Sequence, residues 1–299
     1  MIKSYILTRF NLNLWQVDKN KKETRTNEWL EKRFELFEKY CLPSITNQSC
    51  QEFTWIILFD EETPTEYVER YNSFKTRCPQ FRPIKVKSHA GWYFVRIFQE
   101  VISKDLAQAS TKGEKIEKIT TTYLDNDDSL HKDYISMIRN HALKPIARPT
   151  FITFIYGLQY FEDLNIATEV KYKNNHFLTL IENLLPYEKI KTAYGFGGHG
   201  NVFKYRGCVV DTILEKDNPA WLEVIHDTNA KNDVLLHRWT KVVFNHTILK
   251  TKFGIDIMLR NKGYAKVILF KYLPKRYKAY YRYLLVKIFG YNRIYGKKK

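Results

Sequence analysis

The sequence predicts an α/β fold in which helices cover both faces of a largely parallel sheet. Strand-length apolar runs alternate with helical patterns through the first half of the chain, which is the rhythm of βαβ units. With 299 residues, of which 44% are hydrophobic and 15% aromatic, the chain can bury the core of one large domain. Two of the apolar runs stop at an aspartate, as expected where parallel strands present polar side chains at their carboxyl ends.

The elements of the first half follow from local patterns. We expect strands where apolar and β-branched residues run together, and helices where apolar side chains recur about every three or four positions. Asn27 is expected to cap the first helix, Pro43 to end it and Pro64 to open the second. The expected strands cover residues 3–10, 53–60, 82–88 and 118–125, and the expected helices cover 27–45, the segment after Pro64, 92–110 and 131–142.

The second half has a different pattern. The segments TFITFIYGLQYF, ATEVKYKN and FLTLIEN indicate strands of a meander, and PAWLEVIHDTN (219–229) indicates a short helix. Between them, YGFGGHG (194–200) contains the spacing GxGxxG, but strand-like residues follow it where a dinucleotide fingerprint requires a helix. This loop is therefore either a tight turn between strands or a loop over a substrate with His199 at its tip.

The net charge of +17 is unevenly distributed. Asp256 is the last acidic residue, and thirteen lysines and arginines lie from Arg260 to the end, which leaves a net charge of +4 for the residues before Arg260. We therefore expect a basic C-terminal appendage and not a general polyanion-binding surface. The four scattered cysteines are expected to be reduced thiols, and no apolar run has the length of an export signal or a membrane span.

The sequence DNDD (125–128) follows an expected strand and offers several carboxylates in one turn. Oxygen ligands of this kind suit a hard cation such as Mg²⁺ or Mn²⁺ that also binds phosphate oxygens. A bound cation would also relieve the repulsion between the three acids. The alternative is a polar turn in which Asp128 or Ser129 caps the following helix.

A second group of candidates lies in the expected helix over 219–229. Glu223, His226 and Asp227 have the spacing i, i+3 and i+4, which places them on one helix face. Di-iron bundles use such pairs, but they require two copies on a four-helix scaffold, and the sequence has one. The alternative interpretation is a histidine without a ligand role.

Several segments resemble known glycosyltransferases. In order, LPSITNQSCQEFTWIILFDEETP, GWYFVRIFQEVISKDL and ITTTYLDNDD resemble the nucleotide-binding half of GT-A glycosyltransferases. More closely, ILTRFNL, EWLEKRFELFEKYCLPSITNQS, LDNDD, GGHG and PAWLEVIHDTN resemble the putative rhamnosyltransferase family of bacterial surface-polysaccharide clusters, over most of residues 1–230; Asn126 stands where many members carry an acid. The resemblance implies a GT-A-like mixed sheet in a domain over 1–255, with a nucleotide-binding half (1–130) and an acceptor half (131–255), followed by a basic aromatic helical tail (256–299).

The resemblance also implies which residues bind the donor. Thr8, Arg9 and Asp60 would lie near the base and ribose of the nucleotide. Arg96 would lie near the diphosphate, and Asp125 would reach the ribose or a metal ion. The nucleotide could be UDP, dTDP or GDP.

The same resemblance implies a metal site and a catalytic base. Asp125, Asp127 and His226 would hold Mn²⁺ or Mg²⁺ against the diphosphate. Glu223 or Asp227 would act as the general base that deprotonates the acceptor hydroxyl. With an inverting mechanism, a single base suffices.

The expected function is transfer of a sugar, with rhamnose named by the family, from a nucleotide-sugar donor to a surface-polysaccharide or lipid-linked glycan acceptor. Residues 266–299 interleave cations with aromatic and aliphatic side chains, which suits an anionic membrane surface. The protein is then expected to be cytoplasmic and peripheral at the inner face of the plasma membrane. The alternatives are a tail helix packed on the core, or a basic nucleic-acid-binding protein without catalytic activity, although no recognised nucleic-acid motif accompanies the tail and no such partner is expected.

Overall fold

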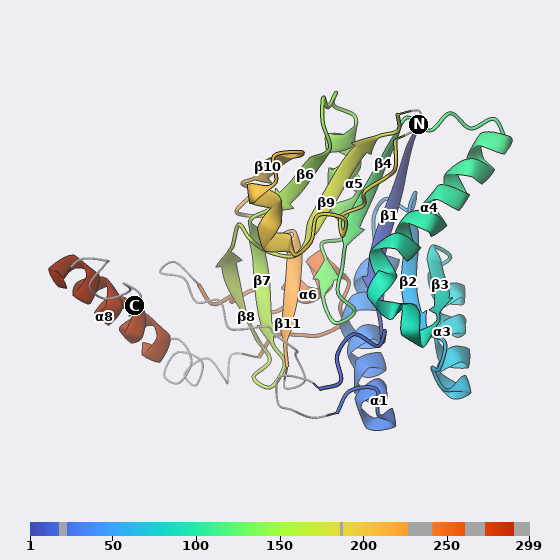
Figure 1. Cartoon of the computed structure of the whole chain (residues 1–299). Coiled ribbons are helices and arrows are strands. Elements are labelled where there is room, and N and C mark those ends of the chain that lie inside the picture. Colours follow the sequence, from blue (N-terminus) through green and yellow to red (C-terminus); the bar gives the residue numbers. More distant parts are fainter. Residues whose placement is uncertain (18–22, 186–187, 227–240, 261–272, 290–299) are drawn as a thin grey trace, which may run out of the picture.

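The computed structural model describes residues 1–17, 23–185, 188–226, 241–260 and 273–289. Its centre is a seven-stranded mixed sheet with the strand order β10-β6-β9-β4-β1-β2-β3, and a four-stranded sheet with the order β5-β11-β7-β8 lies beside it (Figure 1). Helices flank the larger sheet. The predicted α/β fold with a mixed sheet is therefore confirmed.

The first half of the chain builds the parallel part of the large sheet, as its alternating pattern predicts. Neighbouring strands β3, β2, β1 and β4 all run in the same direction. The strands are β1 (Ile2–Arg9), β2 (Thr54–Asp60), β3 (Phe81–Val86) and β4 (Lys118–Tyr123), and the helices between them are α1 (Asn27–Leu36), α3 (Thr65–Arg77) and α4 (Phe94–Thr111), with the 3-10 turn η2 (Ser88–Tyr93) before α4.

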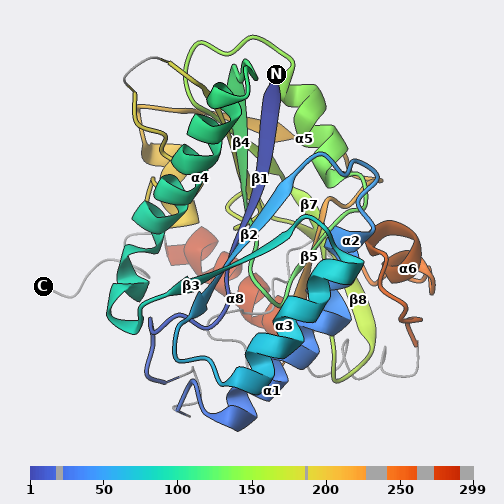
Figure 2. The same cartoon turned by 90° about the vertical axis from the view of Figure 1, so that its right-hand side faces the viewer.

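Both faces of this parallel sheet are buried, which explains the continuous apolar runs in its strands. Side chains alternate along a strand, so that Ile57 packs with the side chains of α1 and α3, whereas Ile56 and Leu58 pack with Phe98 of α4. Figure 2 shows α4 on one side of the sheet and α1 and α3 on the other. Helices thus cover both faces, as predicted.

The first helical segment differs from its prediction at both ends. Thr26, and not Asn27, caps α1 by accepting a hydrogen bond from the Trp29 backbone N–H. Pro43 does not end the helix: a π-helical turn, η1 (Phe37–Cys41), leads into α2 (Leu42–Thr46), which contains Pro43. Proline follows a wider π-helical turn there, in which the Leu42 backbone N–H donates to the Phe37 carbonyl five residues back.

Strands from the second half extend the large sheet and build the small one. Strand β9 is antiparallel to both β4 and β6, whereas β10 is parallel to β6. The strands added to the large sheet are β6 (Thr150–Phe154), β9 (Leu178–Asn183) and β10 (Val209–Ile213). The small sheet consists of β5 (Ser129–Leu130), β7 (Tyr156–Phe161), β8 (Ile166–Lys171) and β11 (Trp221–Ile225). The helical elements of this part are α5 (Tyr134–Ala142) and the 3-10 turn η3 (His199–Lys204).

The prediction of a helix over residues 219–229 is wrong for the described residues of this segment, because Trp221–Ile225 forms strand β11. All five residues are buried, and the strand pairs in parallel with β7. The Trp221 indole N–H donates a hydrogen bond to the Phe154 carbonyl. The Trp221 ring also occupies the space beside Gly157, where an ideal Cβ would lie only 2.1 Å from the ring. Burial on both faces favours the strand over a surface helix.

The described segment 241–260 is packed on the body of the molecule as far as Leu259. After α6 (Ile248–Phe253), Ile255 and Leu259 are buried in a cluster with Leu158 of β7 and Leu222 of β11. Helix α8 (Leu273–Phe289) lies in the predicted basic tail, and Tyr277, Tyr280, Tyr281 and Tyr283 are exposed on it. Within the described ranges, every helix is too short or too polar to cross a membrane.

Candidate functional site

The candidate site lies in the turn that follows β4, at the carboxyl edge of the parallel strands, where ligands bind in open α/β sheets. Two hydrogen bonds fix this turn. The Asn126 side chain donates to the Phe10 carbonyl after β1 (2.9 Å), and the Val224 backbone N–H of β11 donates to Asp128 Oδ1 (3.0 Å). The turn that carries Asp125 and Asp127 is therefore held between the two sheets.

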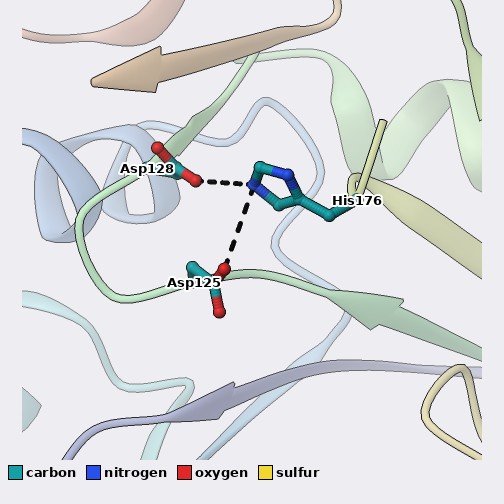
Figure 3. Close-up of side chains that lie close together, drawn as sticks. All are labelled: Asp125, Asp128 and His176. Carbon is teal, nitrogen blue, oxygen red and sulfur yellow. Dashed lines mark hydrogen bonds and ion pairs between the residues drawn. The ribbon is translucent and has the colours of Figure 1, made fainter. Parts of the chain in front are cut away.

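Two of the acids meet a histidine from the other half of the chain. His176, just before β9, lies with its Nε2 2.7 Å from Asp128 Oδ2 and 4.0 Å from Asp125 Oδ2 (Figure 3). One ligand atom from each of the three residues lies within 4.8 Å of the others. Asp128 is fully buried, whereas 36% of the Asp125 side chain is exposed, so the cluster opens to solvent on the Asp125 side.

The charges of this cluster are coupled. Burial alone would lower the pKa of His176, but the hydrogen bond and the negative charge of Asp128 raise that pKa to about 9. Burial also raises the pKa of Asp128, to about 8, so the pair of His176 and Asp128 holds at least one proton near neutral pH. A metal ion that bound here would take the place of that proton, because histidine ligates metals in its neutral form.

The third acid of the turn has different partners. Arg33 Nη1 of α1 donates a 2.7 Å hydrogen bond to Asp127 Oδ2, and His226 Nε2 lies 3.0 Å from the same oxygen. Burial would raise the pKa of Asp127, but the Arg33 guanidinium and His226 hold it below its ordinary value. Asp127 is therefore an ionised carboxylate that joins the turn to α1 and to the end of β11.

Arg9 lies beside Asp125. Its Nη2 donates to the Tyr123 hydroxyl (2.7 Å) and lies 3.6 Å from Asp125 Oδ1. The guanidinium also packs over the rings of Phe94 and Tyr194, at 4.8 and 5.1 Å from their centroids. This aromatic cage holds a permanent positive charge next to the acidic turn.

Asp60 ends β2 at the same edge of the sheet and is 1% exposed. Its Oδ1 accepts hydrogen bonds from the Glu62 backbone N–H (2.9 Å) and the Ser88 hydroxyl (2.5 Å), and it lies 3.2 Å from Arg25 Nη2. Its Oδ2 is buried and makes no hydrogen bond with the described residues. Asp60 thus keeps one acceptor oxygen unused at the edge of the sheet where the nucleotide base is expected.

Two further residues expected to bind the donor are not brought to the acidic turn. Thr8 is fully buried, and its hydroxyl accepts a hydrogen bond from the Trp55 indole N–H (3.0 Å), so its side chain serves the core. Arg96 is 77% exposed on α4, and its Nε donates to Glu100 one helical turn away (2.8 Å).

The predicted grouping of Glu223, His226 and Asp227 on one helix face does not form, because Glu223 lies on strand β11. Glu223 is buried, and its Oε2 accepts a 2.5 Å hydrogen bond from the Gln159 side chain of β7. Burial raises the pKa of Glu223. His226 contacts Asp127 as described above, and Asp227 lies outside the described residues.

The donor set fits a divalent cation. Asp125 and Asp128 supply carboxylate oxygens and His176 supplies an imidazole nitrogen, a combination that Mn²⁺ accepts and that leaves coordination positions for phosphate oxygens and water. Asp127 and His226 form a second possible pair of ligands. However, Asp127 Oδ2 is already in contact with both Arg33 Nη1 and His226 Nε2.

Two residues of the site, His176 and Arg33, are not predicted from the sequence. Local sequence offers no signal for Arg33, because charged side chains are usual on an amphipathic helix. No local signal existed for His176. Only the pairing of β9 with β4 brings the residues just before β9 beside the turn that follows β4.

Acidic and basic side chains thus gather at the carboxyl ends of the parallel strands, which is where enzymes with open α/β sheets bind their ligands. The chain belongs to the family described as "Putative rhamnosyl transferase", whose model matches residues 4–237. The predicted family of glycosyltransferases is thus confirmed. No curated protein sequence matches the chain.

Among solved structures, the chain is similar to TarS of S. aureus. The matches are TarS (10% identity, 75% of this chain and 37% of that chain, TM-score 0.36), TarS 1–349 (9%, 74% and 60%, 0.37) and TarS 1–349 in complex with UDP (10%, 75% and 61%, 0.36). This chain therefore spans between about one third and two thirds of the length of these structures.

Proposed function

We propose that this protein is a metal-dependent glycosyltransferase that moves a sugar from a nucleoside diphosphate donor to an acceptor hydroxyl. The observation that carries the proposal is the cluster of Asp125, Asp128 and His176 at the carboxyl edge of the parallel strands, in a member of a glycosyltransferase family. Arg9 lies next to this cluster and Asp60 lies at the end of β2. They would bind the nucleotide, with Arg9 toward the charged part of the donor.

The metal would be Mn²⁺ or Mg²⁺, held by Asp125, Asp128 and His176. When bound, it would neutralise charge on the departing nucleoside diphosphate. Asp127 and His226 are the other metal ligands that the sequence predicts, but Arg33 and His226 both engage the same oxygen of Asp127. We propose that they brace the turn and do not bind the metal directly.

Glu223 is the described candidate for the general base. Its raised pKa makes its carboxylate a stronger proton acceptor than an ordinary glutamate. In the proposed step, the acceptor hydroxyl oxygen forms a bond to the anomeric carbon, and the hydroxyl proton moves to Glu223. The bond between the anomeric carbon and the diphosphate oxygen breaks, and the nucleoside diphosphate leaves with the electron pair.

Calorimetry tests the donor site. UDP, dTDP and GDP would each be titrated into the protein with and without Mn²⁺, and into the His176→Ala variant. We expect one nucleotide to bind only with Mn²⁺ and binding to weaken at least about tenfold in the variant, the loss of one charge-assisted ligand contact. If no nucleotide binds the wild-type protein under either condition, the proposal is wrong.

The proposal extends to the identity of the donor sugar and of the acceptor. The family description names rhamnose, so nucleotide-linked rhamnose is the first donor to test, and a surface-polysaccharide or lipid-linked glycan is the proposed acceptor. Transfer would be measured by mass spectrometry of the glycan product. A Glu223→Gln variant, which keeps the hydrogen bond to Gln159 possible but cannot accept a proton, would bind donor and lose turnover.

A lipid-linked acceptor would require a peripheral membrane protein on the cytoplasmic side, and α8 supplies a suitable surface. Lys278, Arg282 and Lys287 are exposed on this helix together with its tyrosines. Each cation near an anionic bilayer contributes about 1 kcal/mol, and tyrosine favours the bilayer interface. We therefore propose that α8 docks the enzyme on the inner face of the plasma membrane.

Vesicle flotation would test this docking. The K278E/R282E/K287E variant of the full chain should lose binding to phosphatidylglycerol vesicles. A matched variant, K104E/K112E/K115E, changes the net charge equally on and after α4, where all three lysines are exposed, and should keep most of the binding. Equal behaviour of the two variants would refute a specific role for α8.

A further inference from the structure

The glycine-rich loop between β9 and β10 is anchored on both sides of an exposed tip. Before the tip, Tyr194 is buried and stacks on Phe98 with ring centroids 5.4 Å apart, and Phe196 is buried edge-on against Phe151 at 5.0 Å. After the tip, Val202 is 1% exposed. The ends of the loop are therefore fixed to the core.

The tip itself is open. Gly197 has a φ of +78°, a left-handed conformation that favours glycine, and it turns the chain outward into η3. Among the described residues, apart from the chain neighbours, no atom lies within 4 Å of an ideal Cβ at Gly198 or Gly200. His199 lies between these two glycines and is exposed, so a ligand can reach its imidazole.

His199 faces the acidic cluster. Its ring centroid lies 5.9 Å from that of His176, with an angle of 59° between the rings. The described residues offer the ring nitrogens of His199 no hydrogen bond, whereas His176 is bonded to Asp128. An imidazole thus stands at the edge of the proposed metal site with its polar atoms available.

The order of strands gives His199 a particular place along the donor. Asp60 ends β2, Asp125 follows β4, and His176 precedes β9, and these strands lie in the order β9-β4-β1-β2. A nucleotide with its base near Asp60 and its diphosphate near Asp125 would extend toward β9 and the loop. The phosphate farther from the nucleoside would then lie closest to His199.

We propose that His199 donates a hydrogen bond to the distal phosphate of the nucleoside diphosphate, so that the glycine-rich loop forms one wall of the donor site. This inference rests on the proposed function, because it requires the diphosphate to lie on the Asp125, Asp128 and His176 cluster. A hydrogen bond to a charged phosphate oxygen is among the stronger contacts that a side chain makes.

Calorimetry with diphosphates and monophosphates tests the inference. UDP, dTDP, GDP and the corresponding monophosphates would be titrated in the presence of Mn²⁺ into wild type, His199→Ala, His199→Gln and Lys204→Ala. We expect His199→Ala to weaken diphosphate binding about tenfold and to leave monophosphate binding unchanged. Gln can still donate a hydrogen bond, so His199→Gln should recover part of the affinity.

Lys204→Ala is the matched control, because Lys204 is an exposed cation of η3 in the same loop region. It should leave both affinities unchanged. Mn²⁺ alone would also be titrated into wild type and His199→Ala, and equal binding is expected. His199 is exposed, so thermal unfolding of all variants should match wild type.

Three results would overturn the inference: unchanged diphosphate binding in His199→Ala, equal loss for mono- and diphosphates, or weaker binding of Mn²⁺ alone. In each of these cases the wild-type protein still binds a nucleoside diphosphate, and the proposed function stands. Failure of the wild-type protein to bind any diphosphate would instead refute the proposed function, and this inference with it.

Discussion

At the scale of single residues, the acids of the turn after β4 keep their negative charges apart by taking different partners. Asp127 is paired with Arg33 and His226, Asp128 with His176, and Asp125 lies near Arg9. Each carboxylate therefore has a cationic or proton-donating neighbour. These partners reduce the repulsion among the three acids, and the exposed Asp125 side of the cluster is left for a ligand.

Substitution of Asp127 should separate its role from that of the cluster. In Asp127→Asn, the largely buried Arg33 guanidinium loses its counterion, and the free energy of unfolding should fall by about 3 kcal/mol. Mn²⁺ binding should change little, whereas His176→Ala should weaken it at least about tenfold. Urea unfolding and Mn²⁺ calorimetry check both outcomes. The opposite ranking, with Mn²⁺ binding lost in Asp127→Asn and kept in His176→Ala, would restore Asp127 as a metal ligand.

His131 should make stability depend on pH. Burial lowers the pKa of His131 from 6.5 to about 4, and its Nε2 is buried without a hydrogen bond to the described residues. The folded state therefore binds fewer protons than the unfolded state. The stabilisation, about 3 kcal/mol, is fully present above pH 6.5 and is lost as the pH falls toward 4.

His131→Asn tests this prediction, because an asparagine oxygen can replace Nδ1 as the acceptor of the Asp133 backbone N–H (3.0 Å). Urea unfolding of both proteins between pH 4.5 and 8, at about half-unit steps, should show the wild-type advantage shrinking below pH 6.5. Stability curves that stay parallel over this range would contradict the assigned pKa.

At the scale of elements, strand β11 joins the site to the core. Trp221 at its start packs on Gly157 and bonds to Phe154, Val224 at its centre bonds to Asp128, and Glu223 bonds to Gln159 of β7. Burial on both faces makes the strand rigid. The candidate base and the turn of DNDD are therefore positioned by one element.

Gly157→Ala should show how tightly this element is packed. A Cβ at Gly157 would lie 2.1 Å from the Trp221 ring, so the ring or the strand must move, at a cost of about 1 to 3 kcal/mol of stability or more. Gly198→Ala is the matched control, because in the described part of the chain its Cβ position has open space around it. Thermal unfolding of the two variants should differ by several degrees, and equal midpoints would contradict the packing described.

At the scale of the whole molecule, the site joins segments that are distant in the chain. The turn after β4, the residue before β9 and the end of β11 meet where the two sheets come together. A ligand on this cluster contacts the folded state only, since the unfolded chain does not hold these residues together. Binding and stability are therefore linked.

The bound nucleotide should stabilise the protein by mass action. At about one hundred times its dissociation constant, the nucleoside diphosphate with Mn²⁺ should raise the free energy of unfolding by about 2.7 kcal/mol. Urea unfolding with and without ligand measures the change. EDTA should remove the gain for the wild-type protein; a gain that persists in EDTA would show that donor binding does not depend on the metal.

The sequence by itself determined the parts that depend on local patterns. Strands β1 to β4 and the helices between them follow from apolar runs and helical periodicity, and the aspartates after β2 and β4 follow from the end of those runs. The recurrence of the family motifs in order predicted the family. The predicted boundary between the domain (1–255) and the tail (256–299) stays a prediction. Ile255 and Leu259, which lie on either side of this boundary, both pack on the core.

Only the tertiary structure decided which side chain pairs with each of the three acids of DNDD (125–128). Local pattern could not distinguish a strand from a helix at Trp221–Ile225, because both choices suit a short apolar run and burial on both faces favours the strand. His176 reaches Asp128 through the antiparallel pairing of β9 with β4, and Arg33 reaches Asp127 through the packing of α1. These are contacts between residues far apart in the chain, and spacing along the sequence carries no information about them.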